Sequence, residues 1–100
     1  MAFALPLPRP LAKAGWKVKI RDKERLEEPH VTIMRGTRCW RLGLRSRTFL
    51  DPGDSWGDIP ERPRQHVTAE LNWKRLGQEW DRMYPDNRVT AAEGENGGED

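Results

Sequence analysis

Residues 30–44, HVTIMRGTRCWRLGL, decide the fold, because apolar and polar side chains alternate on both sides of a short turn. Gly36 lies in that turn and can adopt the positive φ that a tight connection needs. If residues 35–38 form the loop, Ile33 faces Trp40, so that apolar side chains meet on one face of the pair. The same register sets the other pairs, which are Met34 with Cys39, Val31 with Leu42, Thr32 with Arg41 and His30 with Gly43. The stretch therefore predicts an antiparallel β-hairpin.

The chain on either side of the hairpin supplies one more strand and one helix. Residues 16–21, WKVKIR, alternate strictly and predict a half-buried strand, which the charged residues 22–28 connect to the hairpin. Residues 46–62 contain turn formers and predict a loop. Beyond Pro63, apolar side chains recur at spacings of four, three, four and three up to Tyr84, which predicts an amphipathic helix. The recurring positions are Ala69, Trp73, Leu76, Trp80 and Met83.

These elements predict an α+β fold, a three-stranded and mostly antiparallel sheet with a C-terminal amphipathic helix packed on one face. We expect a single domain at residues 15–85. A Pro-rich segment, residues 1–14, precedes it, and an acidic tail without apolar periodicity, residues 86–100, follows it and is expected to be disordered.

The composition narrows the class of protein. The 35% apolar and 34% charged residues are typical of a soluble globular chain and predict no membrane segment. One cysteine, Cys39, allows no internal disulfide, and three prolines interrupt the apolar start of the chain, where a signal peptide would be continuous. We therefore expect a cytoplasmic protein.

Charge is distributed unevenly along the chain. Residues 1–50 carry twelve Lys and Arg against four Asp and Glu, a net charge of +8, whereas residues 51–100 carry six against twelve, a net charge of −6. If the helix covers one face of the sheet, the other face is open and presents cations that can neutralise phosphates. These candidate nucleic-acid-binding residues are Lys17, Lys19, Arg21, Arg41 and Arg45. No outward aromatic side chain accompanies them, which favours contact with the backbone or with a duplex over stacking on single-stranded bases.

His30 is the candidate catalytic residue. We expect its ring to be exposed opposite Gly43, among cations that favour the neutral form that a general base needs. A histidine so placed can serve metal-independent cleavage of RNA, in which the 2′-hydroxyl attacks the adjacent phosphate. Two histidines and one cysteine without short spacing predict no zinc site, and no phosphate-binding glycine loop is present, so no cofactor is expected.

The stretch EPHVTI at 28–33, followed by a turn, an apolar strand and a late Trp-bearing helix, resembles a family of small bacterial proteins of unknown function. Its members carry Pro-His-Val-His-Val on the second strand and are often encoded beside a small partner protein, as toxin–antitoxin pairs are. The resemblance covers about residues 16–84 and implies a small α+β fold and a small protein partner. The family's second histidine falls at Thr32. The order of three strands and a helix is also similar to small toxins of the double-stranded-RNA-binding type, an analogy of architecture.

Two functional hypotheses follow. In the first, the protein interacts with nucleic acid, with RNA as partner, and is a toxin-like ribonuclease that uses His30 as base. In the second, it is a non-enzymatic module that binds another protein.

Overall fold

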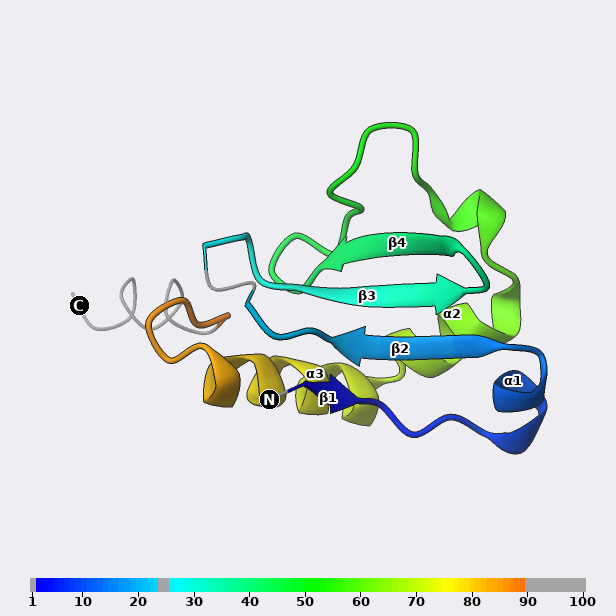
Figure 1. Ribbon diagram of the computed structural model, residues 1–100, viewed down its shortest axis with the longest axis horizontal. Helices are drawn as coiled ribbons and strands as arrows, with labels where there is room; N and C mark the ends of the chain where they lie inside the picture. Colours follow the sequence, from blue (N-terminus) through cyan, green and yellow to red (C-terminus); the bar gives the residue numbers. More distant parts are fainter. Residues whose placement is uncertain (1, 24–25, 90–100) are drawn as a thin grey trace.

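In the described part of the chain, four antiparallel strands form one sheet in the order β1-β2-β3-β4 (Figure 1). The computed structural model describes residues 2–23 and 26–89. The strands are β1 (Phe3–Ala4), β2 (Trp16–Ile20), β3 (His30–Arg35) and β4 (Arg38–Gly43). The predicted α+β class and antiparallel sheet are thus confirmed. The predicted number of strands is wrong, because the described sheet has four strands and not three.

The hairpin β3–β4 has the predicted register. Ile33 faces Trp40, Met34 faces Cys39 and the other predicted pairs recur, and the structure adds one pair, Arg35 with Arg38. Gly36 has a φ of +61°, at the first central position of the two-residue turn, where a type II′ turn places glycine.

The strand that the sequence analysis missed comes from the Pro-rich segment. Phe3 pairs with Ile20, and the backbone N–H of Leu5 donates to the carbonyl of Val18 at 2.9 Å. Leu5 is buried, as is Leu11 in the short helix α1 (Arg9–Lys13) that follows. Proline is tolerated beside an edge strand because no further ladder needs its missing N–H, so the prolines did not exclude a strand here.

The predicted single helix is two helices, α2 (Glu61–Thr68) and α3 (Glu70–Met83), after a short 3₁₀ turn η1 (Trp56–Asp58). The backbone breaks at Ala69, whose ψ of 138° is extended. In a continuous helix, the carbonyl of His66 would accept the N–H of Glu70. Here it accepts a hydrogen bond from the side-chain amide of Asn72 at 2.8 Å instead, so this carbonyl keeps a partner at the break.

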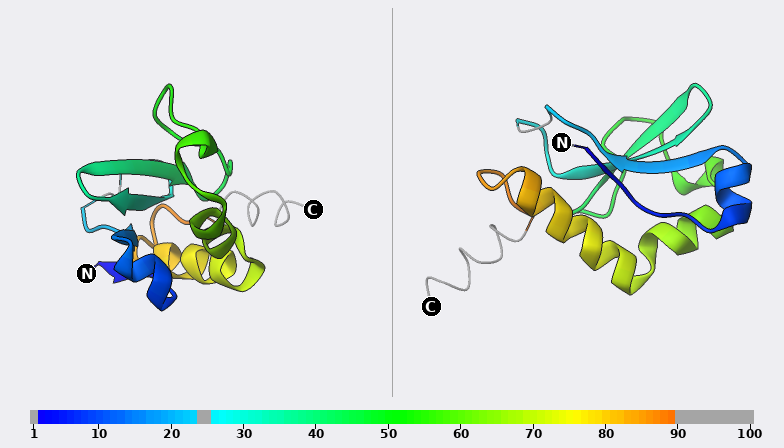
Figure 2. Two further views of the ribbon diagram at one scale, coloured as in Figure 1. Left: turned by 90° about the vertical axis from the view of Figure 1, so that its right-hand side faces the viewer. Right: turned by 60° about the horizontal axis from the view of Figure 1, so that its bottom comes forward.

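The helices lie against one face of the sheet (Figure 2). Of the predicted stripe, Leu76 and Trp80 are fully buried and Trp73 and Met83 are partly buried, whereas Ala69 is exposed at the break between the helices. Helix α2 adds the buried Val67. The sheet contributes buried Trp16, Val18, Ile20, Val31, Ile33, Trp40 and Leu42. Within residues 2–23 and 26–89, no helix combines the length and apolar character needed to cross a lipid bilayer.

Candidate nucleic-acid interface

The outer face of the sheet, opposite to the helices, brings together side chains from three strands. In the register, Lys17 lies beside Met34, and Lys19 lies beside Thr32, which in turn lies beside Arg41. Residues paired directly across an antiparallel sheet point to the same side. Three of the five candidate cations therefore project from one surface, as the alternation of the sequence predicts.

Arg41 is already neutralised by two carboxylates. Its Nε and Nη2 donate to the two oxygens of Asp51 at 3.0 and 2.6 Å, and its Nη1 donates to Glu27 Oε1 at 2.8 Å. The hydrogen bonds that Arg41 donates to Asp51 are the main cause of the raised pKa of Arg41, and Arg41 in turn lowers the pKa of Asp51 below its ordinary value of 3.8. A guanidinium held in this way has few donors left for a phosphate.

Arg21 and Arg45 take up different positions. Arg21 follows β2, and its Nη2 lies 2.9 Å from the sulfur of Met34, so its side chain extends over the outer face. Arg45 instead donates to the backbone carbonyl of Arg88, beyond the end of α3. Arg21 is thus a fourth candidate cation on the outer face, whereas Arg45 lies apart from the other four.

Lys17 and Lys19 have no such partners within the described part of the chain. Among residues 2–23 and 26–89, neither ammonium forms an ion pair or a side-chain hydrogen bond. Lys17 is exposed and Lys19 is half-buried. The uncompensated charge of the outer face therefore lies along β2.

The expectation that His30 is exposed is wrong, because its side chain is fully buried. The ring lies 5.5 Å from that of Trp80, and Nδ1 donates to the carbonyl of Glu28 at 2.7 Å. A carbonyl can only accept, so Nδ1 carries the hydrogen. The other nitrogen, Nε2, lies 3.8 Å from Oε1 of Glu27.

The space that Gly43 was expected to leave open beside His30 is filled. A Cβ built on Gly43 would lie 2.5 Å from Ser46 Oγ and 2.9 Å from Glu28 Oε2. Side chains that follow β4 and precede β3 thus close over this end of the sheet. The ring of His30 therefore offers no nitrogen to a ligand in solution.

Thr32, at the position of the second histidine in the resembling family, is also buried. Its Oγ1 has no hydrogen-bond partner among the described residues. A buried hydroxyl without a partner costs about 1–3 kcal/mol, and we have no structural reason for its presence.

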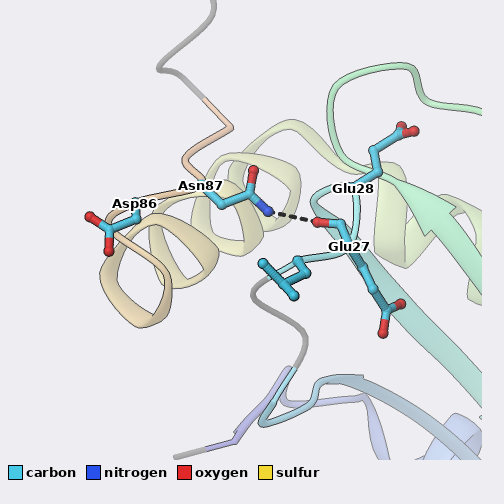
Figure 3. A pocket seen from close by; sticks show the side chains of 5 residues that line it. Glu27, Glu28, Asp86 and Asn87 are labelled. Carbon is cyan, nitrogen blue, oxygen red and sulfur yellow. Dashed lines mark hydrogen bonds between the residues drawn. The ribbon is translucent and has the colours of Figure 1, made fainter.

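One described cavity is lined by acidic side chains whose carboxylates do not converge (Figure 3). It measures about 490 Å³ and is lined by Leu26, Glu27, Glu28, Asp86 and Asn87. Asn87 closes one side through a hydrogen bond to the carbonyl of Glu27 at 2.6 Å, and the three carboxylates point in different directions (Figure 3). Within the described part of the chain, no three His, Cys, Asp or Glu side chains are placed to hold a metal ion.

Two arginines that the sequence analysis assigned only to the turn lie at the exposed end of the hairpin. Arg35 stacks over Trp16 at 5.3 Å and Arg38 over Trp40 at 4.8 Å. Their position could have been predicted from the sequence, because one arginine directly precedes and the other directly follows the two-residue turn.

The chain matches none of the family models searched, and no curated protein or solved structure matches it.

Proposed function

We propose that this protein binds nucleic acid through the phosphate backbone, using the outer-face cations of β2, without cleaving it. The observation that carries the proposal is the row formed by Lys17, Lys19 and Arg21, in which neither lysine contacts a carboxylate among the described residues. Arg41, by contrast, is compensated twice within the protein.

The dimensions of the row suit a polyphosphate. At about 3.3 Å per residue, the chain from Lys17 to Arg21 spans about 13 Å. Duplex DNA carries one negative charge per ~1.7 Å of its axis, so several phosphates lie within reach of the row. The absence of an exposed aromatic side chain from the outer-face register favours contact with the backbone over base stacking.

The proposal contains no catalytic step. His30 was the candidate base, and its buried ring is held between Trp80 and the backbone of Glu28. A general base must come within hydrogen-bond reach of the proton that it removes, and no substrate hydroxyl can approach this ring without local opening.

The experiment is a titration of the protein against labelled duplexes of about 20 base pairs, as DNA and as RNA, at about 50 and 200 mM salt. Three phosphate contacts predict a slope of about −2.7 in log affinity against log salt, so the fourfold rise in salt weakens binding about 40-fold. Absence of binding to either duplex at the lower salt would overturn the proposal.

A control ligand separates this function from the second hypothesis. Under our proposal, polyglutamate binds at least about tenfold more weakly than the duplexes, because its flexible chain must be ordered on the surface. Binding to polyglutamate as tight as that to the duplexes would instead favour a module for an acidic protein partner, such as the small partner that the family resemblance implies.

A further inference from the structure

Thr32 occupies the centre of the outer face of the sheet. Its strand, β3, lies between β2 and β4 (Figure 1). The register pairs Thr32 with Lys19 on one side and with Arg41 on the other. Residues paired directly across antiparallel strands point to the same side, with their Cβ atoms about 4.5–5.5 Å apart. The hydroxyl of Thr32 is therefore carried between a lysine and an arginine.

This hydroxyl is buried without a hydrogen bond. The side chain of Thr32 is 1% exposed, and among residues 2–23 and 26–89 its Oγ1 is the one buried side-chain oxygen or nitrogen that lacks a partner. His30, the other buried polar side chain of β3, does have one, the carbonyl of Glu28. Buried polar side-chain atoms in folded proteins are in the large majority hydrogen-bonded. The exception at Thr32 therefore calls for an acceptor from outside the described part of the chain.

The two neighbours of Thr32 differ in their freedom to move. Arg41 is fixed by three hydrogen bonds to Asp51 and Glu27. Lys19 is half-buried, and its ammonium forms no ion pair or side-chain hydrogen bond among the described residues. A lysine side chain is a flexible four-carbon stem. Lys19 can therefore turn outward without losing such a bond, which opens a path to the hydroxyl from the β2 side.

The chemistry of the position suits a phosphate. A threonine hydroxyl donates one hydrogen bond, and a bond to a charged acceptor is roughly twice as strong as one to a neutral acceptor. The backbone phosphates of nucleic acids accept hydrogen bonds from lysine and threonine side chains alike. A phosphate that Lys19 attracts carries a second oxygen for the hydroxyl beside it. Such an arrangement would satisfy both groups at once.

We infer that Thr32 is a phosphate-binding residue of the β2 interface, whose hydroxyl donates to an oxygen of the backbone phosphate that Lys19 attracts. This inference deepens the proposed function and rests on it. A lysine ammonium acts as a point charge with little directional preference. The hydroxyl adds a donor held by the sheet, so that one phosphate of the bound backbone is placed in register with β3.

The test compares the wild-type protein with Thr32→Val and Thr32→Ser on one duplex of about 20 base pairs at about 100 mM salt. Valine keeps the branched shape and lacks the hydroxyl, so Thr32→Val should bind about tenfold more weakly. Serine keeps the hydroxyl, so Thr32→Ser should stay within about threefold of the wild type. The salt slope of Thr32→Val should be unchanged because no cation is removed, whereas Lys19→Gln should lower it by about 0.9.

The matched control is Thr68→Val on α2, whose hydroxyl donates to the carbonyl of Arg64 at 2.8 Å. It removes the same group away from the outer face and should change affinity by less than about twofold. Melting temperatures establish that each variant is folded. Weaker binding by a Thr32→Val variant at least as stable as the wild type separates the loss of a ligand contact from the loss of structure.

The possible failures are distinguishable. Unchanged affinity in the folded Thr32→Val variant, or an equal loss in Thr32→Ser, overturns the inference about Thr32 and leaves the β2 interface standing. A Thr32→Val variant less stable than the wild type also overturns it, because the hydroxyl would then have a partner in the free protein. Absence of binding by the wild-type protein at low salt overturns the proposed function, and the inference with it.

Discussion

The guanidinium of Arg41 forms a bidentate pair with the carboxylate of Asp51, with Nε–Oδ2 and Nη2–Oδ1 distances of 3.0 and 2.6 Å. Glu27 binds the third nitrogen. This cluster divides the outer face of the sheet into a compensated half at β4 and a cationic half at β2. An anionic ligand would therefore be attracted to Lys17 and Lys19 more than to Arg41.

The same pair predicts an acid-sensitive contribution to stability. Because Arg41 lowers the pKa of Asp51 below its ordinary value of 3.8, the folded state favours the ionised carboxylate. The resulting stability is present above about pH 4 and is lost as the pH falls through the lowered pKa of the folded state. Asp51→Asn should therefore be less stable than the wild type near pH 7, and the difference should shrink toward pH ~2.

Urea unfolding of both proteins across this pH range measures the difference. The matched control is Asp54→Asn. Asp54 lies in the same loop, and its carboxylate forms no ion pair among the described residues. A wild-type advantage over Asp51→Asn that stays constant from neutral to acid pH would contradict the prediction.

His30→Ala should lower the free energy of unfolding by about 2–4 kcal/mol, because it leaves a cavity beside Trp80 and removes the donor to the carbonyl of Glu28. Thermal unfolding measures this loss. His66→Ala is the comparison, since His66 is only partly buried and makes its bond to Pro6 at the edge of the fold, and it should cost less. An unchanged melting temperature for His30→Ala is the result expected of an exposed catalytic histidine, and it would contradict our assignment.

Leu5→Ala should cost about 2–3 kcal/mol of stability, because Leu5 is part of the core although it lies in the Pro-rich segment. The matched control is Leu71→Ala, whose side chain is 81% exposed and whose removal should change stability by less than about 0.5 kcal/mol. Equal melting temperatures for the two variants would show that the N-terminal segment does not contribute to the folded unit.

Thr32→Val should raise stability by about 1 kcal/mol, or the melting temperature by about 4–8 °C, because it replaces a buried hydroxyl that has no partner among the described residues with a methyl group. In Thr68→Val the hydroxyl that is lost donates to the carbonyl of Arg64 at 2.8 Å, so no such gain is expected. Destabilisation by Thr32→Val would indicate that the hydroxyl has a partner, such as a bound water.

The hairpin was predictable because its register depends on local information. Strict alternation on both sides of Gly36 fixes which residues face each other, and a slip by one residue would expose the whole apolar set. The short strand β1 was not predictable in this way. Only Phe3 and Ala4 pair, and the prolines that follow indicated an irregular segment.

The site was less predictable because it depends on contacts between distant residues. Arg41 is bound by Glu27 and Asp51, which are 14 and 10 residues away in the sequence. No local sequence pattern predicts pairs at such separations. Alternation correctly placed His30 opposite Gly43. It could not show that Glu28 and Ser46 fill the space at that glycine.

The most direct test of the β2 interface is the affinity of Lys17→Gln/Lys19→Gln for duplex DNA at about 100 mM salt, beside Lys74→Gln/Arg82→Gln on α3 as a control of equal charge. We predict that the β2 variant binds at least about tenfold more weakly than the wild type, with a salt slope smaller by about 2, and that the α3 variant is nearly unchanged. Equal loss of affinity in the two variants would show that net charge alone governs binding, and would contradict an interface on β2.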